Sequence, residues 1–278
     1  MSHLSSLPLG LYEKALAHDL CWEEKLELVR NCGYDFLEIS IDATPERLTR
    51  LYDAHHPEDL RKAIERVGVP AYTMALTANR DYPLGSEDDA IRGKGMEIVE
   101  RGIAFASRTG IRIVHLAAYD ELGSRCNQRT RERFQQSIGR CAETAAEKGI
   151  ILALETMDAA YMESCANIMK LCRAIDSPYL QCYADIGNLT ASGVDVDTDL
   201  RHGGRHIVGV HLKDTRPGVY RDVLYGEGTV NFDLCLRTLR AIGYSGFFAA
   251  EMWSHDDVAF HGYLPRANRY LREKLSNY

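Results

Sequence analysis

The 278-residue sequence has no hydrophobic run long enough to cross a membrane. A transmembrane helix needs roughly 20 consecutive apolar residues, and no segment of the chain approaches that length. The first residues also lack the basic region and the following apolar region that mark a secretory signal peptide. We therefore expect a cytoplasmic protein with no membrane partner.

An excess of positive charge is also missing. The chain has 33 Lys and Arg residues against 40 Asp and Glu residues, which gives a formal net charge of −7 at pH 7. The basic residues are spread along the sequence rather than clustered. Because a nucleic acid backbone is polyanionic and attracts clustered cations, nucleic acid is not expected as a partner.

Cysteine motifs are absent, although cysteine itself is not rare. None of the eight cysteines forms a C-x-x-C pair, and several stand among apolar residues at helix or strand spacing. We expect reduced, buried thiols that pack as small hydrophobic side chains. The residues concerned are Cys21, Cys32, Cys126, Cys141, Cys165, Cys172, Cys182 and Cys235.

The sequence does contain a regular alternation of short apolar runs and longer segments with helical periodicity. The runs are continuously apolar, as expected for parallel strands that are buried on both faces. Eight strands are predicted, at Leu7–Leu11, Tyr34–Ile41, Val69–Leu76, Ile111–Leu116, Ile150–Glu155, Leu180–Asp185, Ile207–Leu212 and Phe247–Met252.

Helices are predicted between these strands. The first carries the apolar residues Trp22, Leu26 and Val29, with Asp19 as its expected N-cap. A later helix is expected to begin at a capping box formed by Ser86 and Asp89. Further helices are predicted around residues 58–67, 163–175 and 264–276, whereas the pattern over 195–203 is short and weak.

Eight strand–helix units without a flexible linker predict an α/β protein with one domain over residues 1–278, a closed (β/α)8 TIM barrel. An open, doubly wound sheet is the alternative. Its phosphate-binding motif, G-x-G-x-x-G after the first strand, is missing, because Gly10 stands alone. Long connections follow four of the strands, at residues 77–88, 117–126, 213–230 and 253–263, and the active site of a barrel lies at that end.

The last four predicted strands each end at or near a potential metal ligand. These residues are Glu155, Asp185, His211 and Glu251. A carboxylate at the end of a buried strand is costly unless it is paired, and one divalent cation can pair with several. Since the ends of the strands meet at one opening, we predict a site for one divalent metal ion, Zn2+ or Mn2+, with Mg2+ or Co2+ as alternatives.

The segments around these four residues resemble the metal-site segments of xylose-isomerase-like TIM barrels, which include ketose 3-epimerases and endonuclease IV. Other segments look like the L-ribulose-5-phosphate 3-epimerase family, and this similarity covers nearly the whole chain. They are Pro8-Leu9-Gly10-Leu11-Tyr12-Glu13-Lys14, Pro83-Leu84-Gly85-Ser86-Glu87-Asp88-Asp89, Lys213-Asp214-Thr215-Arg216-Pro217-Gly218 and Gly226-Glu227-Gly228.

The resemblance implies a metal-dependent isomerase that interconverts L-ribulose 5-phosphate and L-xylulose 5-phosphate in L-ascorbate and pentulose catabolism. A proton would leave C3 and return on the opposite face through an enediolate that the metal stabilises. Family analogy makes Glu155 and Glu251 both metal ligands and the acid/base pair, with Asp185 and His211 as ligands only. Which glutamate acts first stays open.

A sugar phosphate is the expected small-molecule partner, and its phosphate needs nearby cations. The candidate substrate-binding residues are Lys14, His115, Asn188, Lys213, Arg216 and Arg221, and Arg80 is a further candidate cation. Glu38, Ser40 and His115 are expected to line the opening or to support residues that do. Barrels of this kind often dimerise, so a homodimer is a candidate oligomer, and the oligomeric state stays open at this point.

Three alternatives stay open at this stage. An isomerase acting on a hexulose 6-phosphate or another ketose would use the same residues and move a proton between C1 and C2. An endonuclease IV-like phosphodiesterase is less favoured, because Asn188 stands where that enzyme carries a histidine. A sugar-binding barrel without activity is disfavoured by the two intact carboxylates.

Overall fold

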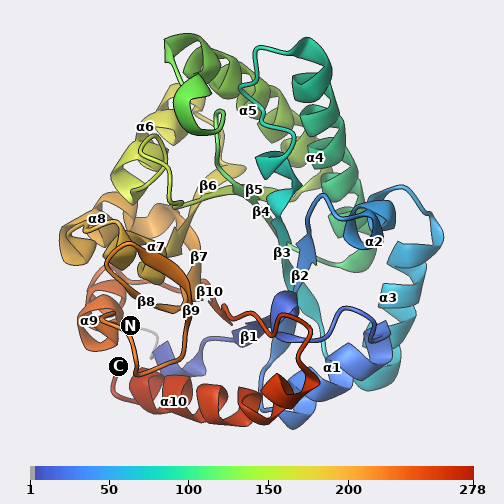
Figure 1. Ribbon diagram of the computed structural model, residues 1–278, viewed down its shortest axis with the longest axis vertical. Coiled ribbons are helices and arrows are strands. Elements are labelled where there is room, and N and C mark those ends of the chain that lie inside the picture. The colour runs from blue at the N-terminus through green and yellow to red at the C-terminus, as the bar shows by residue number, and fades with distance from the viewer. Residues whose placement is uncertain (1–3) are drawn as a thin grey trace.

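A closed barrel of eight parallel strands forms the centre of the molecule, and helices surround it (Figure 1). The computed structural model describes residues 4–278. Around the barrel the strands follow the order β1-β10-β7-β6-β5-β4-β3-β2. Their bounds are Leu9–Tyr12 (β1), Phe36–Ile41 (β2), Ala71–Leu76 (β3), Ile113–Ala117 (β4), Ile151–Glu155 (β5), Leu180–Asp185 (β6), Ile207–Leu212 (β7) and Phe247–Ala250 (β10). The predicted (β/α)8 barrel is confirmed, and each strand end lies within two residues of its prediction.

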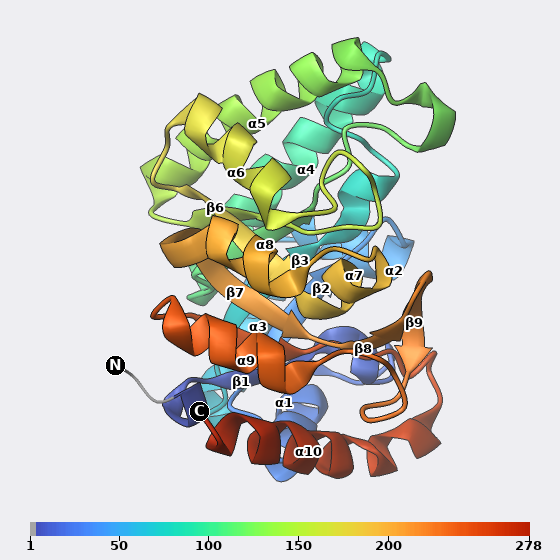
Figure 2. The ribbon, with the colours of Figure 1, turned by 90° about the vertical axis from the view of Figure 1, so that its left-hand side faces the viewer.

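The helices lie along the outside of the barrel, as Figure 2 shows from the side. The α-helices are Trp22–Asn31 (α1), Pro45–Leu48 (α2), His55–Val67 (α3), Asp89–Thr109 (α4), Gln128–Lys148 (α5), Cys165–Ile175 (α6), Ile186–Ala191 (α7), Val196–Gly203 (α8), Phe232–Ala241 (α9) and Leu264–Ser276 (α10). Short 3-10 helices occur at Leu4–Ser6 (η1), Glu13–Ala15 (η2), Thr49–Leu51 (η3), Thr77–Arg80 (η4), Gly123–Arg125 (η5), Gly204–His206 (η6) and Val258–Gly262 (η7). No helix in residues 4–278 combines the length and apolar character of a membrane span.

Both predicted N-caps were wrong. Helix α1 is capped by Cys21, whose backbone N–H donates to the Glu24 carboxylate, so Asp19 lies outside the helix start. Helix α4 is capped by Asp88, whose carboxylate accepts from the backbone N–H groups of the second and third helical residues. A carboxylate next to the first turn can accept from two N–H groups at once, and Ser86 stands too far upstream to do so.

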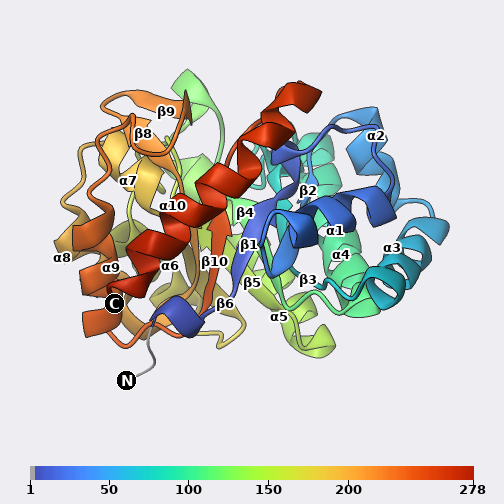
Figure 3. The ribbon, with the colours of Figure 1, turned by 90° about the horizontal axis from the view of Figure 1, so that it is seen from below.

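The long connection after β7 contains regular structure of its own. It contains an antiparallel hairpin of β8, Asp214–Arg216, and β9, Val219–Val223. Gly218 in its turn has a φ of 72°, a conformation that favours glycine. Figure 3 shows the hairpin at the same end of the barrel as α2. The hairpin therefore extends the end at which β5, β6 and β7 finish.

Aromatic side chains fill the barrel interior where glycines leave room for them. Tyr183 of β6 is fully buried, and a Cβ atom added to Gly209 of the neighbouring β7 would collide with its ring. Gly10 of β1 leaves space for Phe36 in the same way. Two small residues thus let large rings enter a closely packed interior. Six of the eight cysteines are buried as predicted, but Cys21 is exposed and Cys126 is half-buried.

A buried ion cluster joins four segments near β1. The Glu13 carboxylate is fully buried and accepts from Lys25 Nζ at 2.7 Å and from Arg50 Nη1 at 2.9 Å. It also accepts from the backbone N–H of Ser40 in β2 at 2.9 Å. Burial alone would raise the pKa of Glu13, but Arg50 and Lys25 outweigh it and hold the pKa well below its usual range. The cluster joins η2, α1, η3 and β2.

We predict that Glu13→Gln destabilises the protein by about 3 to 5 kcal/mol at pH 7, because Lys25 and Arg50 lose their buried counter-charge. The folded pKa lies below the unfolded one, so the stabilisation by Glu13 is present above the unfolded pKa of about 4.3 and is lost as the pH falls further. The difference in unfolding free energy between wild type and variant, measured in urea, should therefore shrink below about pH 4.

The matched control is Glu65→Gln, which removes the exposed carboxylate paired with Arg61 at 2.7 Å. Exposed pairs of this kind contribute less than about 1 kcal/mol. Equal urea midpoints for Glu13→Gln and Glu65→Gln would contradict a stabilising role for the buried cluster.

Candidate active site

Four candidate ligands meet at the carboxyl end of neighbouring strands. Glu155 ends β5, Asp185 ends β6, His211 lies in β7 and Glu251 directly follows β10. These strands are consecutive in the barrel, so the two glutamates stand at the opposite ends of an arc. One ligand atom from each residue lies within 4.8 Å of the other three, and all four residues are buried. The structure thus brings together the four residues predicted from the strand ends.

Local backbone geometry fixes the direction of Asp185. Its Oδ1 atom accepts from the backbone N–H groups of Gly187 and Asn188 at 2.8 and 2.9 Å, which makes Asp185 the N-cap of α7. The backbone N–H of Asp185 donates to Thr156 Oγ1 at 2.8 Å. With Oδ1 bound to the start of the helix, Oδ2 is the oxygen that faces the other candidate ligands.

Lys213 places a positive charge at this cluster. Its Nζ atom lies 2.6 Å from Asp185 Oδ2 and 2.8 Å from Glu251 Oε2. It also donates to Asn188 Oδ1 at 2.8 Å, and the Asn188 amide donates to the Thr156 carbonyl at 2.9 Å. The side chain of Lys213 is 5% exposed, so its charge acts in a poorly solvated place. Lys213 and Asn188 are therefore joined to each other and to two of the candidate ligands.

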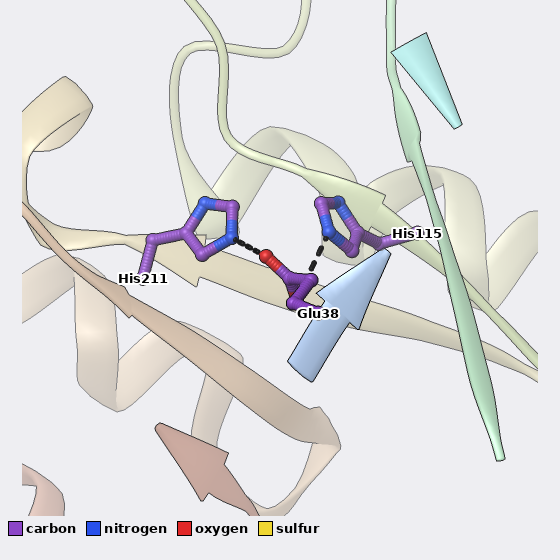
Figure 4. Close-up of side chains that lie close together, drawn as sticks. All are labelled: Glu38, His115 and His211. Carbon is purple, nitrogen blue, oxygen red and sulfur yellow. Dashed lines mark hydrogen bonds and ion pairs between the residues drawn. The ribbon is translucent and has the colours of Figure 1, made fainter. Parts of the chain in front are cut away.

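The two nitrogens of His211 face different carboxylates. Nδ1 lies 2.9 Å from Glu155 Oε1 and 3.5 Å from Glu251 Oε2, on the side of the candidate ligands. Nε2 lies 2.5 Å from Glu38 Oε1, deeper in the barrel. Figure 4 shows Glu38 between His211 and His115, whose Nε2 is 3.3 Å from Glu38 Oε2. The imidazole of His211 thus bridges the site and the barrel interior.

The carboxylates of the site differ in their proton affinity. Burial raises the pKa of Asp185 to about 7, and Glu251 and Glu155 add to the rise against the opposing effects of Lys213 and His211. Burial would also raise the pKa of Glu155 and of Glu251, but neighbouring cations outweigh it and lower both. For Glu155 these cations are His211 and His115, and for Glu251 they are Lys213 and His211.

The basic groups respond in the opposite sense. Burial would lower the pKa of His211, but Glu38, Glu251 and Glu155 raise it well above its usual value. His115 shows the same balance, and Glu38 and Glu155 raise its pKa to about 9. Each pKa shift favours the charged form, except at Asp185. Asp185 is the exception because burial, the largest contribution to its shift, favours the neutral form.

A pocket of about 120 Å3 opens above the cluster. Glu155, Asn188, Lys213 and Glu251 line its inner part. The other lining residues include three cations and two large aromatic side chains, namely Lys14, Arg80, Arg221, Tyr12 and Trp253. The pocket thus combines candidate ligands with four cations, and Asp42, Asp81 and Asp158 also line it.

Two of the predicted substrate-binding residues do not line this pocket. Arg216 is exposed on the hairpin, where its guanidinium donates twice to the Glu227 carbonyl, at 2.8 and 3.0 Å. His115 is fully buried in β4 and stacks on Tyr183, with a ring centroid distance of 4.2 Å. Arg216 supports the hairpin, whereas His115 lies beneath the site, between Glu38 and Glu155.

Sequence reasoning missed the residues that surround Glu38. Thr73 Oγ1 and the Tyr183 hydroxyl both donate to Glu38 Oε2, at 2.6 and 2.8 Å. The available signal was a charged residue between Leu37 and Ile39 in an apolar strand, because such a carboxylate must find partners. Nothing in the sequence indicates that those partners come from β3, β6 and β7.

Comparison with known proteins assigns the chain to a family. The family described as "Xylose isomerase-like TIM barrel" matches residues 26–275. L-ribulose-5-phosphate 3-epimerase UlaE of Escherichia coli O139:H28 is 44% identical over 271 residues, which cover 97% of this chain and 95% of that protein. Both comparisons extend over most of the chain rather than over the site alone.

Solved structures share the fold at lower sequence identity. A D-allulose 3-epimerase from Methylomonas sp. has a TM-score of 0.82 at 16% identity, over 96% of this chain and 98% of that one. An L-ribulose 3-epimerase structure has a TM-score of 0.80 at 20% identity, over 98% of this chain and 95% of that one. The protein belongs to the xylose isomerase-like TIM barrel family and, within it, to the group that contains L-ribulose-5-phosphate 3-epimerase UlaE.

Proposed function

We propose that the protein is a metal-dependent isomerase that interconverts L-ribulose 5-phosphate and L-xylulose 5-phosphate by inverting C3. The observation that carries this proposal is the pair of carboxylates, Glu155 and Glu251, which stand at opposite ends of one arc and line one pocket. Inversion needs a base on one face of C3 and an acid on the other. The relative at 44% identity is named for this reaction. A role in L-ascorbate and pentulose catabolism is part of the same proposal.

The residues fit a divalent cation. Three carboxylates and one imidazole offer the oxygen and nitrogen atoms that Zn2+, Mn2+, Mg2+ and Co2+ accept. Burial first, and then Glu251 and Glu155, raise the pKa of Asp185 to about 7, and a bound cation would favour its ionised form. Glu155, Asp185, His211 and Glu251 would hold the ion. When bound, the ion would polarise the sugar oxygens at C2 and C3 and make the hydrogen at C3 more acidic.

The two glutamates are the proposed acid and base that transfer the C3 proton. Their lowered pKa values keep each one ionised at neutral pH, as a general base requires. One carboxylate takes the proton from C3, and the other, after taking up a proton from the solvent, returns that proton to the opposite face. Lys213, 2.8 Å from Glu251, adds a fixed positive charge beside the developing anion. Asn188 and Lys213 line the same pocket and are proposed to bind the sugar hydroxyl groups.

The phosphate group is proposed to bind at the rim of the pocket. Lys14 is paired with Asp42 at 2.6 Å, and Arg80 lies 3.7 Å from Asp158. Arg221 forms no ion pair with any residue in 4–278, and its guanidinium lies over the Trp253 ring, 5.3 Å from the centroid. Arg221 is therefore the cation with most capacity left for a phosphate dianion.

The proposal is tested by following L-xylulose 5-phosphate in D2O with metal-loaded protein and recording C3 by NMR. We expect L-ribulose 5-phosphate to form with deuterium at C3, because the proton that is returned comes from a group that exchanges with solvent. Label at C1 would identify an aldose–ketose isomerase instead. If no carbon of the sugar takes up deuterium, the proposed reaction is contradicted.

Replacing either glutamate by glutamine should remove catalysis. We predict that Glu155→Gln and Glu251→Gln each lower kcat by about 100-fold or more, because an amide cannot accept the C3 proton. Steady-state rates measured at saturating metal, with metal content determined in parallel, separate this loss from weakened metal binding. A variant that keeps a tenth of the wild-type kcat would refute the two-carboxylate mechanism.

The proposed phosphate contact is tested by replacing Arg221 of the hairpin. We predict that Arg221→Ala raises KM for L-ribulose 5-phosphate by about 10-fold or more, because a charged hydrogen bond contributes about 1.5 to 3 kcal/mol. KM for unphosphorylated L-ribulose should change far less. Arg216→Ala is the matched control, since Arg216 lies on the same hairpin but donates to Glu227 instead of lining the pocket. Equal effects of Arg221→Ala on both sugars would exclude Arg221 from the phosphate site.

A further inference from the structure

Glu38 lies inside the barrel, opposite the strands that carry the candidate ligands. It belongs to β2, which stands across the barrel from β6 and is not hydrogen-bonded to β7. Its side chain is fully buried and does not line the pocket. The carboxylate nevertheless reaches His211 of β7 (Figure 4). Substrate therefore does not touch Glu38, and any effect on the reaction passes through His211.

The partners of Glu38 fix its orientation. Oε2 accepts from Thr73 Oγ1 at 2.6 Å and from the Tyr183 hydroxyl at 2.8 Å, and His115 Nε2 lies 3.3 Å away. These contacts come from β3, β6 and β4. With Oε2 held by two hydroxyl groups, Oε1 is the oxygen that faces His211 Nε2, at 2.5 Å. The carboxylate is thus held from several sides and directed at one imidazole nitrogen.

This arrangement gives Nε2 of His211 a fixed hydrogen-bond acceptor. A carboxylate oxygen accepts hydrogen bonds and cannot donate one, so the nitrogen that faces it must bear the hydrogen. That nitrogen is Nε2. Nδ1, on the opposite edge of the ring, faces Glu155 and Glu251 within 3.5 Å. Glu38 thus keeps a hydrogen on Nε2, and once Nδ1 gives up its hydrogen to bind a cation, the Nδ1 lone pair lies on the side of the other candidate ligands.

We propose that Glu38 is the positioning residue of the metal site: by accepting the Nε2 hydrogen it fixes the ring of His211 and presents Nδ1 to the cation. This inference rests on the proposed function, since it requires a metal ion at Glu155, Asp185, His211 and Glu251. A carboxylate behind a ligating imidazole fixes the tautomer and ring orientation and raises the basicity of the ligand.

A second metal ion at Glu38 is the competing interpretation. Glu38, His115 and His211 also lie close enough together to hold an ion. However, Oε2 of Glu38 already accepts two hydroxyl hydrogen bonds, and His211 would have to use both nitrogens as ligands. His115 favours this interpretation, because its ring nitrogens make no hydrogen bond in residues 4–278. The number of ions bound per chain separates the two interpretations.

The test measures Co2+ binding, with the visible absorption of the bound ion as the signal. Wild type should bind one Co2+ per chain, and Glu38→Ala should bind it about 10- to 100-fold more weakly, as expected for loss of such a partner. Glu38→Gln should recover part of the affinity, because its amide oxygen accepts the same hydrogen bond. Thr73→Val is the matched control: it removes a hydrogen bond to Oε2 and leaves the contact with His211.

A second readout is the 15N NMR signal of the His211 ring in the Zn2+-loaded protein, assigned by comparison with His211→Asn. Wild type should show a slowly exchanging proton on Nε2 and a metal-shifted Nδ1. Glu38→Ala should lose this slow exchange, and Thr73→Val should keep it. A structural role alone would lower the melting temperature of both variants without this difference.

The outcomes separate the inference from the proposed function. If wild type binds no Co2+, the metal site itself fails, and this result requires no variant. If wild type binds one ion and folded Glu38→Ala binds it within threefold of wild type, only the positioning role is overturned. Two ions per chain in wild type, with one lost in Glu38→Ala, would make Glu38 a ligand and overturn the proposal. Failure of both Glu38 variants to fold would assign Glu38 to folding instead.

Discussion

Three buried carboxylates lie around one point, and the surrounding structure has to compensate their negative charge. Glu155, Asp185 and Glu251 repel one another in a region that water barely reaches, so each needs a nearby positive charge or hydrogen-bond donor. Lys213 supplies an ammonium group to two of them, and His211 contacts the third. The folded chain thus provides part of the compensation itself, before any cation binds.

The barrel holds these carboxylates in a defined geometry. Four neighbouring strands place one ligand each at a common end, which explains why residues that are up to 96 positions apart in the sequence meet within 4.8 Å. The interior then extends the network away from the pocket, because Gly209 leaves room for Tyr183 and Tyr183 reaches Glu38. Packing inside the barrel and the orientation of His211 are therefore parts of one arrangement.

The sequence was sufficient to predict the barrel and the four candidate ligands, because strand ends and apolar runs leave local signals. It did not predict the hairpin, although Pro217-Gly218 is a turn signal between two short strands. For that reason Arg216 and Arg221 were treated alike, whereas the hairpin places only Arg221 at the pocket. His115 was expected near the substrate because it ends an apolar run, but no local pattern shows whether such a side chain faces the opening or the interior.

The charges of the interior also explain why a phosphate would bind at the rim. Glu38, Glu155, Asp185 and Glu251 carry four negative charges when ionised, against three positive charges when His115, His211 and Lys213 are all protonated. If a divalent cation binds and His211 becomes neutral to ligate it, the positive charges equal the negative ones. A neutral interior offers no further attraction for a phosphate dianion, so the dianion must find its counter-charges among Lys14, Arg80 and Arg221. Because Lys14 and Arg80 are already paired with Asp42 and Asp158, Arg221 is the rim cation that keeps its charge for the dianion.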